Sequence, residues 1–349
     1  MTDAKLMGRW MGLREGTPIE FRQLISQLKD TQRGLTASAA ASVIMQNGEV
    51  MWEWYSGNHS VRPGARRVDA NSQFNVASSR KTYIAFAVAY ALLHGKIGSI
   101  DDTVEEYLPD VQGIERRRIR HLLTHTHGLQ EQDGKLVHLF TEGTNWQYNN
   151  AGVNLLVKIV ERTTGNTVAE ILQRHALDPL GFSQTGWKTY HQDNLIFNVH
   201  EETDVLGPND SARGDQSNLF TSAREFARWG NLHLNNGRSN GHQLLPASVF
   251  SELTTIQSPE SLPRSLPTHG FFWWVQGDTN SPMSELGERV PVGAFQVLGF
   301  TGCACLVIPA LNVVAVRMLN YTGQHQHSEF DYLTDIRQFG NVVTSLFAG

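Results

Sequence analysis

The chain has 349 residues, of which 40% are hydrophobic and 18% are charged, and its net charge is −5 at pH 7. This composition does not suggest disorder, and the mild acidity gives no electrostatic reason to expect nucleic acid as a partner. The length allows two lobes or one large mixed domain. Only two cysteines occur, Cys303 and Cys305, which excludes a disulfide framework and predicts two free thiols.

The first residues, 1–20, carry charges throughout and lack a long apolar core. We therefore expect no secretory signal. No later segment is apolar over the roughly 18 residues that a membrane-spanning helix needs. These features predict a cytoplasmic protein without a membrane partner.

The first predicted elements are a helix over residues 19–28 and two strands over residues 37–46 and 49–55. Asn47-Gly48 lies between the strands, and Asn-Gly between two apolar runs is the strongest short signal for a β-hairpin. Residues 79–93 follow as a helix that is apolar on nearly all sides, so we expect it to be buried. Further helices are predicted over residues 116–124, 151–163, 167–177 and 222–234.

Strands return late in the chain, over residues 271–276, 303–308 and 313–319, and residues 330–347 form a closing amphipathic helix. Strands at both ends with helices between them predict a mixed α/β protein. We expect a discontinuous α/β lobe, about residues 1–75 and 265–349, that holds a mostly helical lobe of about residues 76–264.

A first chemical motif is S-x-x-K, formed by Ser78 and Lys81. If Ser78 opens the predicted helix, Lys81 lies one turn further on the same face. A serine hydroxyl needs a nearby base to become nucleophilic, and burial lowers the pKa of a lysine. The helix N-terminus also favours a developing negative charge. A serine that simply caps the helix is the alternative interpretation.

A second motif, Y-x-N, places Tyr148 and Asn150 just before the predicted helix over residues 151–163. A tyrosine beside a lysine ammonium can relay protons, and an asparagine offers a donor and an acceptor to an amide or ester carbonyl. The alternative is a packed tyrosine and a capping asparagine.

A third motif, Gly299-Phe300-Thr301-Gly302, leads into the strand that begins at Cys303. Glycines beside a strand allow a substrate backbone to approach closely, although a β-bulge would also explain them.

These three motifs, in this order, resemble the serine β-lactamase and penicillin-binding protein superfamily, and within it the class C β-lactamase branch with its esterase and peptidase relatives. Residues 119–129 (IRHLLTHTHGL) are similar to that branch's R-x-L-L-T-H-T-S-G-L segment, and residues 178–182 (DPLGF) are similar to its P-L-G-M segment. The resemblance covers nearly the whole chain. It implies one β-lactamase/transpeptidase-like catalytic domain over residues 1–349, with an antiparallel sheet flanked by N- and C-terminal helices.

The resemblance also implies catalytic roles. Ser78 would attack the substrate carbonyl, Lys81 would activate Ser78 and share its proton, and Tyr148 would act as the general base and later protonate the leaving group.

Five further residues are implied to bind substrate: Asn150, Phe300, Thr301, Gly302 and Cys303. Asn150 would hold the substrate carbonyl. The backbone N–H groups of Ser78 and Cys303 would form the oxyanion hole, so the Cys303 thiol has no necessary role.

Phe300 departs from the family pattern, because the third motif usually begins with Lys or His. A cation there recognises the substrate carboxylate and supports the Tyr–Lys pair, and phenylalanine can do neither. We therefore expect neutral esters to be better substrates than carboxylate-bearing ones. His325 and His327 are candidates to replace the charge. The alternative interpretations are that both are surface residues, or that the alignment of this motif is shifted by one residue.

Three histidines, His121, His125 and His127, resemble a metal-ligand set, but no zincin glutamate follows His121. We expect no metal and no cofactor. Trp273 and Trp274 either line an acyl pocket or belong to the core.

The sequence thus predicts a serine hydrolase that works through an acyl-enzyme on Ser78, most simply a carboxylesterase-type enzyme whose partner is a small-molecule ester or amide. The alternatives are a D-amino-acid peptidase or amidase and a weak β-lactamase. The missing signal sequence counts against a cell-wall peptidase. Phe300 favours an alternative of another class, a catalytically impaired penicillin-binding-like binding protein. Fold resemblance alone does not choose among these functions.

Overall fold

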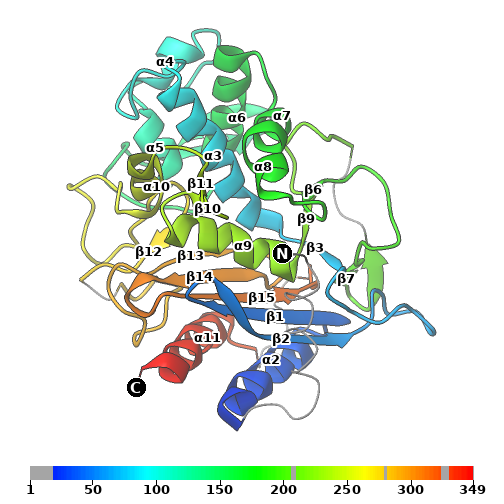
Figure 1. The fold of residues 1–349 in the computed structure, drawn as a ribbon. Coiled ribbons are helices and arrows are strands. Elements are labelled where there is room, and N and C mark those ends of the chain that lie inside the picture. The colour runs from blue at the N-terminus through cyan, green and yellow to red at the C-terminus, as the bar shows by residue number, and fades with distance from the viewer. Residues whose placement is uncertain (1–18, 206–209, 279–280, 324–329, 349) are drawn as a thin grey trace.

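The structure, a computed structural model, describes residues 19–205, 210–278, 281–323 and 330–348. Its centre is an antiparallel sheet with the strand order β12-β13-β14-β15-β1-β2 (Figure 1). The strands are β1 (Ala39–Gln46), β2 (Glu49–Gly57), β12 (Trp274–Val275), β13 (Phe295–Leu298), β14 (Ala304–Ile308) and β15 (Val313–Leu319). Because β1 pairs with β15, the first and last parts of the chain share one sheet.

The hairpin between β1 and β2 is confirmed. Asn47 and Gly48 have φ angles of 53° and 78°, which is the backbone that a two-residue turn of the favoured hairpin type requires. The middle strands β14 and β15 are buried along their whole length. A strand covered on both faces is expected to be a continuous apolar run, and β15 departs from that pattern only at Arg317.

Helices cover both faces of the sheet (Figure 1). The terminal helices α2 (Arg22–Gly34) and α11 (Tyr332–Phe347) contact each other on one face, and α9 (Ala223–Leu234) packs on β1, β14 and β15 from the other. An apolar stripe of the terminal helices lies in the core, including Leu24, Leu28, Ile336 and Phe339. The predicted antiparallel sheet flanked by N- and C-terminal helices is therefore confirmed.

The remaining helices gather beyond α9 around α3 (Lys81–Leu93), which contacts α6 (Ala151–Thr164), α7 (Val168–Leu172) and α10 (Ala247–Thr254). The first nine residues of α3 are all buried, as its uniformly apolar sequence predicts. Short helices complete this part of the molecule, namely α4 (Val104–Tyr107), α5 (Ile119–Leu123) and α8 (Asp178–Leu180).

A small sheet connects the helical part to the main sheet. It consists of β3 (Gln73–Asn75), β9 (Leu219–Ser222) and β6 (Gly186–Trp187) in the order β3-β9-β6. The sequence analysis did not predict these short strands. They determine where the segment before Ser78 lies.

Three further strand pairs lie in loops: β4 (Leu129–Gln132) with β5 (Lys135–His138), β7 (Asn198–His200) with β8 (Thr203–Val205), and β10 (Arg238–Ser239) with β11 (His242–Gln243). The strand predicted over residues 271–276 is reduced to β12, because Phe272 has a φ angle of 63° and interrupts the extended backbone. In the described part of the chain, no helix combines the length and the apolar character that crossing a membrane requires.

Candidate active site

The segment that carries Ser78 is a tight turn between β3 and α3. Residues Ala77–Arg80 form a 3₁₀ turn, and Ala77 has a φ angle of 45°, a conformation that costs about 1–3 kcal/mol in a non-glycine residue. The side chain of Asn75 supports it, since its Oδ1 accepts the Ala77 N–H at 2.7 Å. Ser78 is the one residue of this turn that is not fully buried. The fold therefore holds a strained turn that presents Ser78.

Ser78, Lys81 and Tyr148 come together although they belong to separate segments. The Lys81 Nζ donates to Ser78 Oγ at 3.1 Å and to the Tyr148 hydroxyl. It also lies 4.0 Å from the centroid of the Tyr148 ring. Lys81 is only 2% exposed, so the amine contacts its two partners in a largely dehydrated place. This geometry allows proton transfer among the three groups.

Burial changes the protonation of the lysine and the tyrosine in opposite ways. Burial, and after it the charge of Arg80, holds the pKa of Lys81 well below its usual range. Burial raises the pKa of the Tyr148 hydroxyl to about 12, although a hydrogen bond with Ser78 and the charge of Arg80 act to lower it. The Tyr148 ring as a whole is 41% exposed, so the dehydrated part is its hydroxyl end. The neutral forms of both groups are favoured.

Arg80 lies inside the S-x-x-K turn, and the sequence analysis did not select it. The residue is 3% exposed, and its buried Nε and Nη1 atoms have no hydrogen-bond partner among the described residues. Burial lowers the pKa of Arg80, whereas the negative charge of Asp215 acts to raise it. The signal in the sequence is a second basic residue immediately before Lys81. An unpaired buried cation is costly, so its place beside two titratable groups is informative.

The third motif packs directly against the turn of Ser78. The Thr301 hydroxyl is buried and donates to the carbonyl oxygen of Asn75 at 2.8 Å. A Cβ on Gly299 would lie 2.3 Å from the carbonyl oxygen of Val76, so only glycine permits this approach. The Thr301 side chain thus joins the two loops.

Cys303 and Phe300 have opposite environments at the two ends of this motif. The Cys303 thiol is buried, lies 3.3 Å from the Leu319 carbonyl oxygen and has a raised pKa because of burial. Only its backbone is placed to contribute to the site. Phe300 is 53% exposed and occupies the position at which the resemblance implies a cation. His325 and His327, considered as replacements for that cation, lie outside the described residues.

Asn150 is exposed at the start of α6, and its side chain does not cap the helix. The neighbouring Asn149 makes that type of contact instead, because its Oδ1 accepts the Ala151 N–H at 2.7 Å. The capping interpretation therefore applies to Asn149, and the Asn150 amide is open to a substrate carbonyl.

Buried aromatic and histidine rings form the surroundings of Tyr148. The ring of His125 lies 4.6 Å from the Tyr148 ring, and Trp146 stacks on His269 with 5.6 Å between ring centroids. Burial lowers the pKa of His269 to about 3, so this ring is neutral. The side chain of Trp274 also packs here. This apolar packing limits the positions that Tyr148 can take.

The other predicted aromatic and histidine contacts are structural. Trp273 is fully buried, as the core interpretation requires. His121 and His127 each use Nδ1 to accept a backbone N–H. In the part of the chain that is described, no group of three or more His, Cys, Asp or Glu side chains is arranged to hold a metal ion.

Glu285 is a second charged residue that the sequence analysis missed. Burial raises the pKa of its carboxyl group to about 7, although a hydrogen bond from Tyr332, with a length of 3.0 Å, acts to lower it. Its charge in turn acts to raise the pKa of Tyr148. No motif marks this residue, since it reaches the site from the loop before β13.

Comparisons with known proteins agree with this arrangement. The family model described as Beta-lactamase matches residues 21–337. An uncharacterized protein of Alkalihalophilus pseudofirmus is 40% identical over 95% of this chain and 98% of its own length. Esterase EstB of Burkholderia gladioli is 25% identical over 46% of this chain and 50% of its own length. A solved class C beta-lactamase superposes with a TM-score of 0.75 at 17% identity, over 96% of this chain and all of that one. The chain therefore belongs to the beta-lactamase family of serine hydrolases, which also includes penicillin-binding proteins and esterases.

Proposed function

We propose that this protein is a carboxylesterase-type hydrolase that cleaves small neutral esters through an acyl-enzyme on Ser78. The observation that carries the proposal is the contact of Lys81 Nζ with Ser78 Oγ at 3.1 Å, in a place where burial and Arg80 favour the neutral amine. A neutral amine at this distance can accept the serine proton.

In the acylation step, Ser78 Oγ attacks the ester carbonyl and its proton passes to Lys81. The oxygen of the tetrahedral intermediate binds to the backbone N–H groups of Ser78 and Cys303. The Tyr148 phenol, hydrogen bonded to Lys81, then gives its proton to the leaving alkoxide and recovers one from Lys81. The C–O bond to the alcohol breaks, and the acyl group remains on Ser78.

In the second step, water attacks the acyl-enzyme while the same groups act in reverse. The water gives a proton to the Tyr148–Lys81 pair as its oxygen bonds to the acyl carbon, and Ser78 leaves with that proton. This scheme differs from the role implied by the resemblance, in which Tyr148 is the general base. The raised pKa of Tyr148 favours Lys81 as the first proton acceptor and Tyr148 as a relay.

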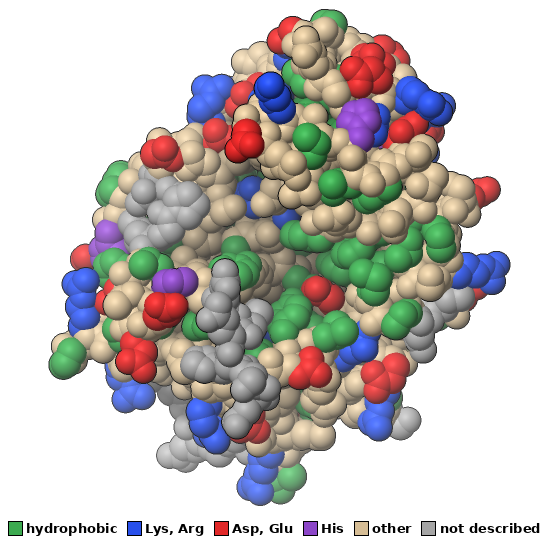
Figure 2. All heavy atoms as spheres, turned by 180° about the vertical axis from the view of Figure 1, so that it is seen from behind, with side chains coloured by type: hydrophobic (Ala, Val, Ile, Leu, Met, Phe, Trp, Pro, Cys, Tyr) green, Lys and Arg blue, Asp and Glu red, His purple; other side chains and the backbone are tan. Residues whose placement is uncertain are grey.

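The shape and polarity of the molecule support a small neutral substrate. Figure 2 shows a hollow in one face, with Lys or Arg atoms visible inside it and hydrophobic side chains along part of its rim. Small molecules generally bind in concave places of this kind. The exposed Phe300 adds apolar surface where a carboxylate-binding cation is expected. EstB, among the relatives, is an esterase.

A weak β-lactamase is the second candidate. Arg80 places a positive charge near the site, which would attract the carboxylate of a β-lactam. The contacts of Ser78, Lys81 and Tyr148 count against the impaired binding protein, since such a protein has no need to keep them. The cytoplasmic location stays a prediction.

The test compares turnover of p-nitrophenyl butyrate with turnover of nitrocefin, and Ser78→Ala serves as the control. We expect fast ester cleavage and little nitrocefin cleavage, both lost in Ser78→Ala. Dominant nitrocefin cleavage would make the β-lactamase the better assignment. Ester cleavage that survives in Ser78→Ala would refute the proposed nucleophile.

A further inference from the structure

Arg317 is a charged residue inside an otherwise apolar strand. It is 1% exposed on β15, and its guanidinium has two partners. The Nε donates to the carbonyl oxygen of Gly302 at 3.1 Å, and Nη1 donates to Asp335 Oδ2 of α11 at 2.7 Å. The rigid fork of arginine suits two partners in fixed directions. One residue thus connects the third motif to the C-terminal helix.

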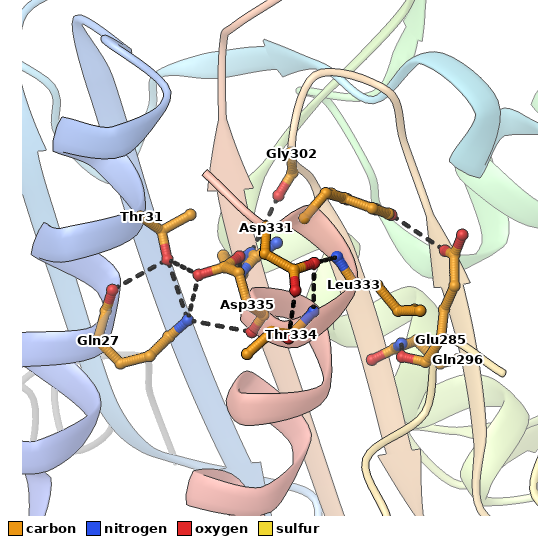
Figure 3. A network of polar contacts seen from close by, with 11 residues as sticks. Gln27, Thr31, Glu285, Gln296, Gly302, Asp331, Leu333, Thr334 and Asp335 are labelled. Carbon is orange, nitrogen blue, oxygen red and sulfur yellow. Dashed lines mark hydrogen bonds and ion pairs between the residues drawn. The ribbon is translucent and has the colours of Figure 1, made fainter. Parts of the chain in front are cut away.

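The carboxylate of Asp335 is itself held from the N-terminal helix. Its Oδ1 accepts from the Thr31 hydroxyl at 2.5 Å and from the Gln27 amide at 2.9 Å. Figure 3 shows Gln27, Thr31 and Asp335 meeting below the carbonyl of Gly302. A buried charge is less costly when hydrogen bonds satisfy its atoms, and each oxygen of the Asp335 carboxylate accepts at least one hydrogen bond here. The residue that holds Gly302 is therefore tied to both terminal helices.

The Gly302 carbonyl and the Cys303 N–H belong to the same peptide group. The described chain contains no cis peptide bond, and in a trans peptide the C=O and N–H point in opposite directions. When Arg317 holds the carbonyl, the N–H must point away from Arg317. Cys303 lies outside the β13–β14 ladder, and within the described ranges its N–H has no backbone acceptor. The N–H is thus oriented and unused.

We propose that Arg317 is a positioning residue that fixes the Gly302–Cys303 peptide, so that the Cys303 N–H serves as an oxyanion-hole donor. The inference rests on the proposed acyl transfer at Ser78. Arg317 acts through geometry. It does not touch the substrate, but it sets the direction of the Cys303 N–H, which does. The ion pair with Asp335 connects Arg317 to the C-terminal helix, whereas the separate contact with the Gly302 carbonyl sets the direction of the peptide.

The test uses Arg317→Met and Arg317→Lys with an ester and the matching thionoester, whose C=S accepts hydrogen bonds poorly. An enzyme with an ordered oxyanion hole prefers the ester strongly. We expect Arg317→Met to lower kcat for the ester about 10²-fold, the effect of losing one oxyanion donor, and to reduce the ester-to-thionoester ratio of kcat/KM. Arg317→Lys should fall between wild type and Arg317→Met, because a lysine ammonium keeps the charge but lacks the rigid planar fork that reaches both partners in fixed directions.

Asp335→Asn is the matched control. It removes the ion pair but leaves Arg317 able to donate to Gly302, so stability should fall while the ester-to-thionoester ratio stays near wild type. If both Arg317 variants fold and keep the wild-type ratio, the proposal is wrong. If Asp335→Asn lowers the ester-to-thionoester ratio as much as the Arg317 variants do, Arg317 contributes only to the stability of the fold and does not position the Cys303 N–H.

The rate of fluorophosphonate labelling separates this inference from the proposed function. The probe phosphonylates Ser78, and its P=O oxygen occupies the oxyanion hole, whatever the natural substrate is. Labelling of wild type without ester turnover would refute the esterase, while slower labelling in the Arg317 variants would still support the inference. Wild-type protein that is not labelled at all would overturn both.

Discussion

Two arginines lie on opposite sides of the candidate site, and the fold treats them differently. On the side of the main sheet, Arg317 donates through Nε to Gly302 and through Nη1 to Asp335. On the helical side, Arg80 is equally buried, but its Nε and Nη1 atoms have no hydrogen-bond partner among the described residues. A paired guanidinium fixes geometry, because its hydrogen bonds set directions. Nitrogen atoms without hydrogen-bond partners fix no direction, and Arg80 acts on Lys81 through its positive charge, which lowers the pKa of Lys81.

The comparison separates two requirements of acyl transfer. The oxyanion hole needs donors in fixed positions, and the part of the site that supplies Cys303 is built on hydrogen bonds. The nucleophile needs a base with a suitable pKa, and the part that supplies Lys81 is built on burial and charge. Substitutions on the helical side should therefore alter the pKa of Lys81. Substitutions on the sheet side should alter the orientation of the Cys303 N–H.

The largest expected effect concerns Lys81, which accepts the proton of Ser78 in the proposed mechanism. Lys81→Met should lower kcat/KM for p-nitrophenyl butyrate by about 10³-fold or more, because general-base catalysis contributes about 10²–10⁴. The side chain is similar in length and apolar, so the buried site should tolerate it. Steady-state kinetics with the folded variant measure the effect. A loss below tenfold would show that another group accepts the serine proton.

The next effect concerns the proton relay. Tyr148→Phe removes only the hydroxyl that Lys81 contacts, and it keeps the ring against His125. We expect kcat to fall about 10²-fold for esters with poor leaving groups, which need a proton, and much less for p-nitrophenyl esters, which do not. Comparing ethyl and p-nitrophenyl esters tests this. Equal losses for both would place Tyr148 in the attack step rather than the leaving step.

The parts of the fold that local sequence patterns determine could be predicted from the sequence. The hairpin at Asn47-Gly48, the buried helix α3 and the flanking terminal helices follow from turn chemistry and apolar periodicity. The strands β3, β6 and β9 were missed because each has only two to four residues, too few for a periodic signal. Their pairing joins segments that are far apart in the sequence, and it depends on the packing of the whole chain.

The candidate site was predictable where a motif marks it. Ser78, Lys81 and Tyr148 occupy motif positions, and the structure brings them together. Arg80, Glu285 and Arg317 carry no such mark. Their importance comes from burial and from partners distant in the sequence, and a single sequence shows neither. The motif position of Thr301 predicts substrate binding, and it did not predict the contact of the Thr301 hydroxyl with the carbonyl oxygen of Asn75.

A smaller effect tests the unpaired arginine through pH. Catalysis needs neutral Lys81, so activity should rise as pH increases through the pKa of Lys81. Burial lowers that pKa first and Arg80 lowers it further. Arg80→Met removes the second cause, so the pKa of Lys81 rises and the ascending limb of the kcat/KM profile should move to higher pH. Burial still lowers the pKa of Lys81 in this variant, so that pKa should stay below the usual value for a lysine.

Arg80→Lys is the control, because it keeps the charge and should keep the profile near wild type. One neighbouring group titrates in the same range, because burial raises the pKa of the Glu285 carboxyl to about 7, and a Glu285→Gln background removes its contribution to the profile. The other neighbouring groups titrate outside this range. Burial and the charge of Lys81 hold the pKa of His125 far below neutrality, and Tyr148 has a pKa of about 12. An unchanged ascending limb in a folded Arg80→Met protein would mean that burial alone lowers the pKa of Lys81.

The smallest expected effect concerns selectivity at Phe300. Since Phe300 is half exposed, lysine there needs no new buried space, and it supplies the cation with which the third motif usually begins. Phe300→Lys should raise the ratio of nitrocefin to p-nitrophenyl butyrate turnover about tenfold, the effect of one charge-assisted hydrogen bond of roughly 1.4 kcal/mol. Phe300→Met removes the ring without adding charge and should leave the ratio close to wild type. If lysine and methionine change the ratio equally, the ring excludes carboxylates by its shape, and the missing cation is not the cause.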